Sequence, residues 1–487
     1  MRIPWLSRTI PSVGWLKLGK EIVSVIKKLL IANRGEIVVR VMKTCRKLGI
    51  KTVAVYSEPD KNLSYLRHAD EACHIGPANP IKSYLNMEAI LDAVKKSGAD
   101  AVHPGYGFLS ENSLFANAVV SGGTTWVGPP PSVLAEIDSK CYCRRIATNS
   151  GVPVVPGTIE IIKDEGDIIR FASEHGYPLV LKLDKGGGGK GIEQIREDGQ
   201  AKEAFERLSR IGLMAFGHQE SYIEQLIAAP RHIEVQFLAD RAGHCLCLGE
   251  RECSIQRRYQ KIIEESPSPV VTMEDRDTLY RHTANLVKTM GYQGAGTMEF
   301  LRSEDGSFYF MEVNARLQVE HPVSEFLTGI DIVEEQLKIA SGRELDVRQQ
   351  DVSLKGYSIE ARIYAEDPVS FFPSPGTISR LRVPEVDAAH LRIDHAIEEG
   401  CTVPPYYDPL LAKVISWGES RSEAIDYLLK ALSEFQIEGI KTTIPANLLI
   451  LDSREYRTGD LHTGFLERLY SKAASEDGSI KPLWPNM

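Results

Sequence analysis

The sequence has no apolar run of the ~20 residues that a membrane-spanning helix needs, because Lys, Glu or Gly interrupts every longer hydrophobic stretch. It also has no excess of positive charge: 57 Lys and Arg stand against 66 Asp and Glu, a net charge of −9. Nucleic acid and anionic lipid are therefore not expected partners, and an anion site must be built from local residues. Eight cysteines in 487 residues are too sparse for a disulfide scaffold. We expect reduced thiols, no membrane contact and a cytoplasmic location.

The composition is that of a soluble globular protein, with 43% hydrophobic and 25% charged residues. At ~150 residues per domain, this length predicts about three structural units. Residues 1–25 form an N-terminal extension that carries Arg2, Arg8, Lys17 and Lys20 and a single acid, Glu21. This composition resembles that of an organelle transit peptide. An extension from an upstream start is the alternative, because the compact pattern begins near Val25.

Strands and helices alternate along the first unit. A buried strand covers 29–32, a helical pattern covers 35–48 and a second strand ends at Tyr56, which predicts a βαβ unit in a parallel sheet. A single helix is expected over 133–150. Later in the chain, 233–240 and 244–250 alternate like paired antiparallel strands, and a third, β-rich unit is expected from about residue 356.

Residues 186–189 are four consecutive glycines between Lys185 and Lys190. Such a run costs backbone entropy and leaves N–H groups open, which suits the close approach of a phosphate. It is not a P-loop, because Gly191 stands where that motif has Ser or Thr. One interpretation is a phosphate-covering loop, and the alternative is a hairpin loop without a ligand.

A second candidate site lies around Asp305-Gly306, a dipeptide that predicts a two-residue turn between two β-rich runs. This turn sets Glu299 opposite Glu312, with Cβ atoms ~5 Å apart, and such like charges are unfavourable unless a cation joins them. Asn314 shares their face. Two carboxylates and an amide oxygen suit Mg²⁺. The alternative is an acid pair facing solvent at a sheet edge, which the aromatic residues on both runs disfavour.

Two charged segments complete the candidates. Residues 315–322 follow the hairpin, and within them Arg316 offers a planar fork for an oxyanion while Glu320 can act as a base. The segment 250–261 concentrates Arg and Lys side chains in an otherwise acidic chain. Taken by itself, this second segment is expected to be a solvated surface patch.

Long motifs recur in a recognisable order along the chain. They are IANRGEI (31–37), KSYLN (82–86), HPGYGFLSEN (103–112), PRHIEVQ (230–236), ERECSIQRR (250–258), GYQGAGTMEF (291–300), EVNARLQVEHPV (312–323), IEARIYAEDP (359–368), PSPGTI (373–378) and TVPPYYD (402–408). On these motifs the sequence resembles the biotin carboxylases of the ATP-grasp superfamily, from about residue 27 to residue 469.

The resemblance implies a mixed α/β and α+β fold in three parts. After the extension over 1–25, a Rossmann-like N-terminal domain covers 26–139 and an ATP-grasp domain covers 140–354. Within the latter, a glycine-rich lid spans about 156–228. A β-rich C-terminal biotin carboxylase domain covers 355–470, and 471–487 form a tail.

The resemblance also implies a reaction and its residues: ATP-dependent carboxylation of biotin, with bicarbonate activated as carboxyphosphate. Residues expected to bind the nucleotide are Lys140, Lys182, Gly187, Gly188, Gly189, Glu224, Ile227, His232 and Gln256. Those expected to hold Mg²⁺ or Mn²⁺ are Glu299, Glu312 and Asn314. Bicarbonate would be held by Lys261, Arg316, Gln318, Val319 and Glu320, and biotin by Tyr84 and Arg362. The catalytic residues would be Lys261, Arg316, Glu320 and Arg362.

Three features depart from the family pattern. Leu183, Asp184 and Lys185 follow the lid lysine, where the family has a small residue, Ser and Gly, so the charge near the phosphates differs. Tyr259 stands where the family has His near the ribose. Lys43 and Lys47 stand where a dimer face of the family pairs Arg with Glu, which leaves a homodimer possible.

The sequence contains no A-M-K-M-like biotin attachment motif, so the biotin carboxyl carrier protein and the carboxyltransferase are expected on separate chains. The chain would then be a stand-alone subunit of an acetyl-CoA, propionyl-CoA or pyruvate carboxylase, and the sequence does not name the final acceptor. Another ATP-grasp ligase with an acyl-phosphate intermediate is one alternative, and a non-catalytic nucleotide-binding subunit is another. A dinucleotide oxidoreductase is disfavoured, because the first strand leads into Asn33-Arg34-Gly35 rather than G-x-G-x-x-G.

Overall fold

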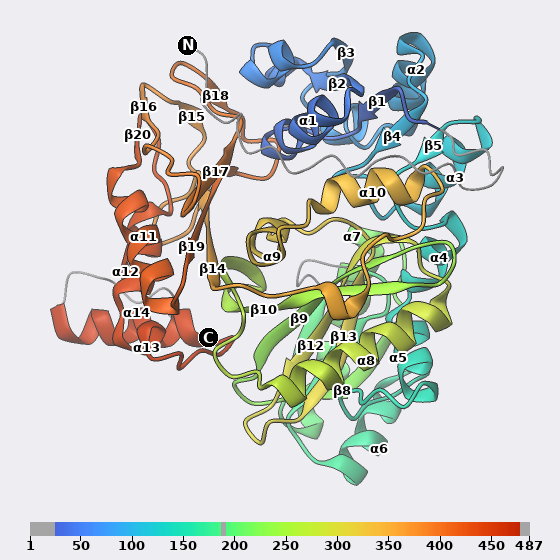
Figure 1. Cartoon of the computed structure of the whole chain (residues 1–487). Coiled ribbons are helices and arrows are strands. Elements are labelled where there is room, and N and C mark those ends of the chain that lie inside the picture. Colours follow the sequence, from blue (N-terminus) through green and yellow to red (C-terminus); the bar gives the residue numbers. More distant parts are fainter. Residues whose placement is uncertain (1–24, 187–190, 478–487) are drawn as a thin grey trace.

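The computed structural model describes residues 25–186 and 191–477. Three units pack around a central sheet that extends into the C-terminal part of the chain (Figure 1). The extension up to residue 24 and the expected phosphate-binding residues Gly187, Gly188 and Gly189 lie outside the described residues. Within the described ranges, no helix has both the length and the apolar character needed to cross a bilayer. All eight cysteines are free thiols, as the sequence predicts.

The N-terminal unit is the parallel sheet that the alternating pattern predicts, with strand order β3-β2-β1-β4-β5. Its strands are β1 (Lys28–Ile31), β2 (Lys51–Ser57), β3 (Glu71–Gly76), β4 (Ala101–His103) and β5 (Thr125–Trp126), and its helices are α1 (Glu36–Leu48), α2 (Met87–Ser97) and α3 (Ser113–Ser121). Helix α1 buries Ile37, Val38 and Val41, which share one face at helical spacing.

The single helix expected over 133–150 is wrong, because the structure has two helices there. Helix α4 covers Pro131–Ile137 and α5 covers Lys140–Asn149. Ser139 between them is extended, and its hydroxyl accepts a hydrogen bond from the Tyr142 N–H. A serine N-cap therefore starts a new helix, and Lys140 becomes the first residue of α5.

A small antiparallel sheet of order β7-β6-β8 follows, made of β6 (Leu179–Leu183), β7 (Ile192–Ile195) and β8 (Ser221–Gln225). Helices α6 (Glu165–His175) and α7 (Ala201–Phe216) belong to the same unit. This unit has its own core, which includes Ile168, Leu181, Leu208 and Ile223.

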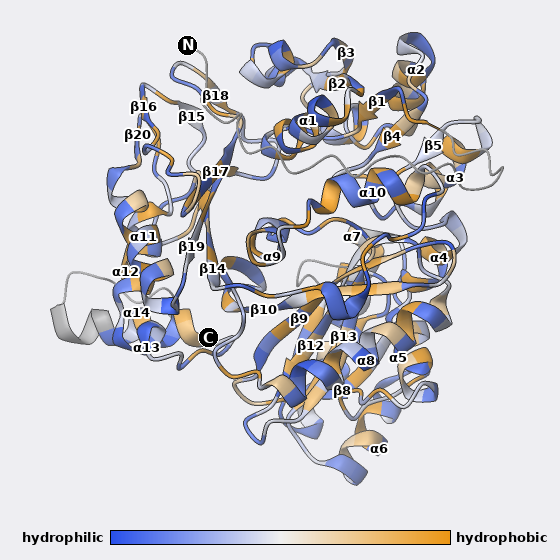
Figure 2. Cartoon of the chain, in the orientation of Figure 1, coloured by the Kyte–Doolittle hydropathy of each residue, from blue (hydrophilic) through white to orange (hydrophobic). Residues whose placement is uncertain are grey.

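The central sheet has eight strands in the order β13-β12-β9-β10-β11-β14-β19-β17. The first five positions are β13 (Phe308–Asn314), β12 (Gly294–Arg302), β9 (Arg231–Ala239), β10 (Cys245–Arg257) and β11 (Gln260–Ser266), with helices α8 (Met273–Met290), α9 (His321–Thr328) and α10 (Ile332–Ala340). Strands β9 and β10 are antiparallel, as expected. One core cluster joins Val102 and Phe115 of the N-terminal unit to Phe237 and Phe300 of this sheet. Surface helices such as α10 show both hydrophilic and hydrophobic residues (Figure 2).

The C-terminal strands continue this sheet, because β14 pairs with β11. The elements of this part are β14 (Tyr357–Tyr364), β15 (Gly376–Thr377), β16 (Arg380–Arg382), β17 (Leu391–His395), β18 (Thr402–Val403), β19 (Leu410–Gly418), β20 (Gln436–Glu438), α11 (Arg421–Glu434), α12 (Ile444–Asp452), α13 (Arg454–Arg457) and α14 (Phe465–Asp477). The three-part α/β architecture is confirmed. The β11–β14 pairing brings Arg362 of β14 next to the residues of the central strands.

Candidate active site

The candidate active site is a cluster of buried charges on the central sheet, with Lys261 of β11 at its centre. The Lys261 Nζ lies 2.7 Å from Glu320 Oε1 and 3.0 Å from Glu299 Oε1. It also lies 2.5 Å from Glu234 Oε2. Burial lowers the pKa of Lys261, but the three carboxylates outweigh burial and raise that pKa well above its ordinary value. Lys261 is therefore a permanent positive charge at the centre of the cluster.

Glu320, which immediately precedes α9, is fully buried but ionised. Burial raises its pKa, whereas Lys261 and Arg362 lower it well below the ordinary value. Its two oxygens are shared: Oε1 faces Lys261 and Oε2 lies 2.9 Å from Arg362 Nη2. An ionised carboxylate in this position is able to accept a proton from a bound acid.

The segment 250–261 is not the surface patch that its composition suggests. Arg251 is fully buried, and its Nε lies 2.5 Å from Glu234 Oε1. Its Nη1 donates to Gln236 Oε1 at 2.8 Å. Because side chains alternate along β10, Arg251 lies on the buried face of the sheet. There Glu234 forms ion pairs with both Arg251 and Lys261. The sequence reasoning missed Glu234 and Arg251, although both lie within motifs of the resemblance.

Glu299 of β12 and Glu312 of β13 are directly opposite each other, as the sequence predicts. The predicted two-residue turn is wrong. The turn runs from Ser303 to Ser307, where the Gly306 N–H donates to the Ser303 carbonyl and Gly306 has φ 90°. A bulge between the acid pair and Phe310 then shifts the register by one residue. These two deviations cancel, so the acids meet as expected.

The two carboxylates of this hairpin are oxygen ligands of the kind that a hard divalent cation prefers, whereas Asn314 turns its amide N–H toward Glu299 and its Oδ1 toward Arg316. The Glu299 Oε1 accepts hydrogen bonds from Asn314 Nδ2 at 2.7 Å and from Lys261. Burial raises the pKa of Glu299, but Lys261 and His232 hold it below the ordinary range. Burial and the negative Glu299 raise the pKa of Glu312, while Lys140 at 3.9 Å opposes them. Additional positive charge would therefore stabilise the ionised form of the pair, and Mg²⁺ or Mn²⁺ would supply it.

Arg316 and Gln318 form a short network beside the acid pair. The Arg316 Nη2 donates to Asn314 Oδ1 at 2.8 Å, and Nη1 donates to Gln318 Oε1 at 3.0 Å. Its Nε donates to Glu111 Oε2 at 3.0 Å, so a residue of the N-terminal unit anchors it. Gln318 Nε2 also lies 3.3 Å from Glu299 Oε1, so the segment between β13 and α9 connects Arg316 through Gln318 to the acid pair and through Glu320 to Lys261.

Arg362 of β14 completes the cluster from the C-terminal part of the chain. Its Nη2 lies 2.5 Å from Glu264 Oε1 and 2.9 Å from Glu320 Oε2. Its Nη1 donates to the Tyr364 hydroxyl at 3.2 Å. The guanidinium is thus fixed on one side by acids, beside the ionised Glu320.

The expected nucleotide residues are divided between two places. Lys140 at the start of α5 donates to the Gly186 carbonyl, and Lys182 of β6 pairs with the buried Glu224 of β8. Glu224 also pairs with Arg144, a buried residue that the sequence reasoning missed. On the central sheet, the Gln256 amide lies 2.7 Å from His232 Nδ1. The His232 Nε2 lies 3.1 Å from Glu299 Oε2.

The carboxyl group of Asp184, which departs from the family pattern, is bound to the start of α5. It is buried at the N-terminus of α5, where Oδ1 accepts hydrogen bonds from the Cys141 N–H at 2.7 Å and from Ser139 Oγ at 3.0 Å. At this position, where the sequence departs from the family pattern, the side chain caps the N-terminus of α5.

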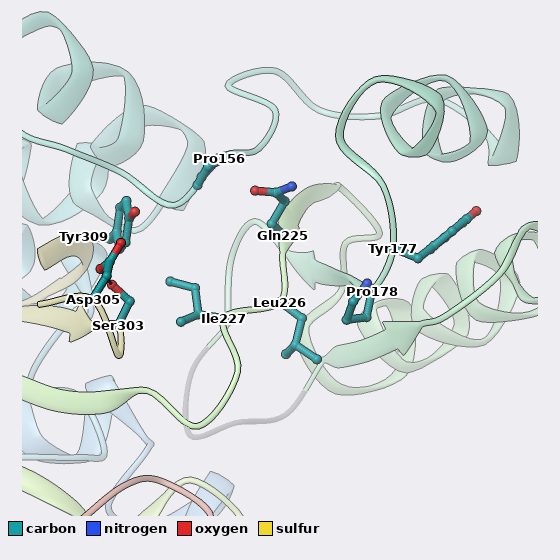
Figure 3. A pocket seen from close by; sticks show the side chains of 9 residues that line it. All are labelled: Pro156, Tyr177, Pro178, Gln225, Leu226, Ile227, Ser303, Asp305 and Tyr309. Atoms are coloured by element: carbon teal, nitrogen blue, oxygen red, sulfur yellow. Dashed lines mark hydrogen bonds between the residues drawn. The ribbon is translucent and has the colours of Figure 1, made fainter. Parts of the chain in front are cut away.

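Ile227 follows β8 and lines a pocket between the small sheet and the β12–β13 hairpin (Figure 3). On one side, Ser303, Asp305 and Tyr309 of the hairpin face it, and on the other lie Gln225 and Pro178. The pocket adjoins the segment where the resemblance places the adenine edge, and that role of Ile227 stays a prediction.

Tyr84 does not lie in the candidate site. It is fully buried in the N-terminal unit, and its hydroxyl donates to Asp60 Oδ2 at 2.6 Å. The half-buried Tyr106 of the motif HPGYGFLSEN donates its hydroxyl to Glu36, and burial together with the charge of Glu36 raises the pKa of Tyr106. The contact of Tyr84 with biotin stays a prediction, and Tyr364 is a tyrosine in direct contact with the cluster, through Arg362.

Family models cover most of the chain. The models described as biotin carboxylase, N-terminal domain, and biotin carboxylase C-terminal domain match residues 25–134 and 360–468. Between them, the model of the carbamoyl-phosphate synthase L chain, ATP binding domain, matches residues 139–348. The chain belongs to the biotin carboxylase family. As a member of this ATP-grasp family it is a ligase, which excludes the dinucleotide oxidoreductase.

Individual relatives agree over nearly the full length. Biotin carboxylase 2 of Bacillus subtilis is 47% identical over 441 residues, covering 91% of this chain and 99% of the relative. The biotin carboxylase of Halalkalibacterium halodurans is 46% identical, covering 90% of this chain and 97% of the relative. The biotin carboxylase domain dimer of Hydrogenobacter thermophilus 2-oxoglutarate carboxylase, solved with MgADP, ADP and bicarbonate, has a TM-score of 0.89. It is 44% identical and covers 91% of this chain and 98% of its own.

Proposed function

We propose that this chain carboxylates biotin on a separate carrier protein, using ATP and bicarbonate, as the first half-reaction of a biotin-dependent carboxylase. The observation that carries the proposal is the arrangement of Lys261, Glu320 and Arg362, a cation, an ionised base and a second cation in contact beside an acid pair. Bicarbonate, with one negative charge and one acidic proton, matches this arrangement.

Each group of residues has its own part in this reaction. Lys261 and Arg316 neutralise bicarbonate, and Glu320 takes its proton as a bicarbonate oxygen attacks the γ-phosphorus of ATP and ADP leaves. The resulting carboxyphosphate breaks its C–O bond into CO₂ and phosphate. That phosphate removes the ureido N–H proton of biotin, and the nitrogen attacks CO₂ while Arg362 stabilises the negative ureido oxygen. Glu299 and Glu312 would hold Mg²⁺ or Mn²⁺, which would supply positive charge to the phosphate oxygens.

The partners follow from the same proposal. A biotin carboxyl carrier protein and a carboxyltransferase would receive and use the carboxyl group, and the relatives include subunits of pyruvate and 2-oxoglutarate carboxylases. The neighbouring 2-oxoglutarate carboxylase domain is a dimer. In this chain, Lys43 and Lys47 pair internally with Asp394 and Glu334, so a homodimer would use other contacts at this position.

Phosphate release from ATP, measured with and without bicarbonate and with and without free biotin, tests the proposal. We expect cleavage that requires bicarbonate and is stimulated by biotin. Equal rates with and without biotin would favour another ATP-grasp ligase. No ATP cleavage under any of these conditions would favour a non-catalytic nucleotide-binding subunit.

A further inference from the structure

Lys413 is a fully buried lysine on β19 that the proposed reaction does not use. It is the cross-strand partner of Arg362 in the β14–β19 ladder, so both side chains leave the same face of the sheet. Its Nζ donates to the Val319 carbonyl oxygen at 2.8 Å. The same Nζ lies 3.2 Å from Glu36 Oε1, in the first turn of α1.

These contacts join three parts of the fold. Lys413 belongs to the C-terminal strands, Val319 to the turn before α9 and Glu36 to the N-terminal unit. Glu36 also accepts a hydrogen bond from the hydroxyl of Tyr106. A buried lysine is costly to desolvate, and its ion pair with Glu36 repays that cost only in part. The buried carboxyls of Glu360 and of Asp394, the cross-strand neighbour of Lys413 on β17, also interact with this ammonium group. The hydrogen bond to the Val319 carbonyl is the contact that connects it to the turn before α9.

The position of Val319 gives this contact a consequence. Its neighbours along the chain are Gln318, whose amide lies 3.3 Å from Glu299 Oε1, and Glu320, which contacts Lys261 and Arg362. Both neighbours are proposed bicarbonate contacts. Fixing the Val319 carbonyl therefore fixes the backbone from which both of these side chains project.

We propose that Lys413 is a positioning residue for bicarbonate, which holds the turn of Gln318, Val319 and Glu320 in its binding conformation through the Val319 carbonyl. This inference rests on the proposed function. A purely structural role, in which Lys413 only neutralises the buried acids around it, makes a different prediction: the bicarbonate KM should then return to normal as stability is restored by removing the Glu36 charge as well.

The test compares Lys413→Met, Glu36→Gln and the double variant, with Lys430→Met on the exposed side of α11 as the control. Lys413→Met leaves Glu36 buried without its cation and is expected to lower the melting temperature, whereas the double variant removes both charges of this pair and is expected to recover part of the lost stability. Loss of a hydrogen bond from a charged donor predicts a rise of about 10-fold or more in the KM for bicarbonate. The KM for ATP should stay within about 2-fold, because the nucleotide contacts are elsewhere.

The double variant decides between the two roles. A raised bicarbonate KM that persists after stability has recovered supports the positioning role, and unchanged values for Lys430→Met and Glu36→Gln support it further. A double variant with a normal bicarbonate KM would overturn it, as would a folded Lys413→Met with normal kinetics. If the unmodified chain shows no bicarbonate-dependent ATP cleavage, the proposed function is wrong, and the inference about Lys413 is then wrong as well.

Discussion

Glu299 and Glu312 are direct cross-strand neighbours, yet their surroundings differ in charge. Lys261 and His232 lie within 3.1 Å of Glu299 and hold its pKa below the ordinary range despite burial. The Lys140 Nζ lies 3.9 Å from Glu312 Oε2, and burial together with Glu299 raises the pKa of Glu312 although Lys140 opposes them. One acid of the pair is thus already neutralised by the protein, and the other is the one that a divalent cation would stabilise.

Glu312→Gln is therefore expected to weaken the response to Mg²⁺ selectively. Removing the negative charge should raise the Mg²⁺ concentration for half-maximal ATP cleavage by roughly 10-fold or more, the scale seen when metal-site partners are lost. Glu304→Gln in the exposed loop of the same hairpin is the matched control. A Mg²⁺ titration that is the same for Glu312→Gln and the control would contradict the assignment.

Arg362→Ala should separate the two halves of the reaction. The guanidinium contacts Glu264 and Glu320 but no residue of the nucleotide region, so ATP binding should remain while carboxybiotin formation falls by at least about 100-fold, the order expected for a lost charge-stabilising donor. Radiolabelled bicarbonate incorporated into biotin measures the second step. Arg380→Ala, an exposed arginine of the same part of the chain, is the control. Unchanged carboxybiotin formation in Arg362→Ala would remove this residue from the mechanism.

Arg251→Met should unfold the protein more easily than a surface substitution does. The change leaves Gln236 without its donor and Glu234 with Lys261 as its remaining cation, so the cost should approach but not exceed the about 3–5 kcal/mol of a fully broken buried ion pair. Thermal unfolding of Arg251→Met should therefore show a clearly lower midpoint, whereas Arg241→Ala at the exposed β9–β10 turn should not. Equal midpoints for both variants would mean that Arg251 is not held as described.

Glu264 predicts a pH dependence of stability. Burial raises its pKa from 4.5 to about 7, although Arg362 opposes this. Between these two pH values the folded chain binds more protons at this site than the unfolded chain, so its contribution to stability is complete below pH 4.5 and is lost as the pH rises through about 7. Glu264→Gln should flatten this fall in a series of melting temperatures. A variant with the same pH profile as the unmodified chain would show that Glu264 does not titrate there.

The spacing of hydrophobic residues predicted helices and strands correctly where that spacing is regular. The parallel N-terminal sheet, the β9–β10 pair and the Glu299–Glu312 juxtaposition could all be read from alternation and helical spacing. The break at Ser139 was missed because a capping serine inside an amphipathic run looks like one more polar helix residue. The predicted pairing of Glu299 with Glu312 is right although the predicted turn is wrong, because the longer turn shifts the register by one residue and the bulge shifts it back.

The residues of the site were harder to predict from the sequence, because the burial of a side chain depends on the whole fold. The segment 250–261 has the composition of a surface, and only the pairing of β10 with β9 and β11 encloses Arg251. Lys413 and Glu36 are distant in sequence and carry no local signal of their contact. Tyr84 and Tyr106 both lie in motifs of the family, and only the fold shows that the hydroxyl of the first contacts Asp60 while that of the second contacts Glu36.

The central claim is that bicarbonate itself attacks ATP beside Lys261 and Glu320. The most direct measurement supplies bicarbonate labelled with ¹⁸O and follows the label into the phosphate released from ATP. Because the attacking oxygen stays on phosphorus when carboxyphosphate breaks its C–O bond, we expect one bicarbonate oxygen in each phosphate. Phosphate that carries oxygen from water alone would show simple ATP hydrolysis and contradict this mechanism.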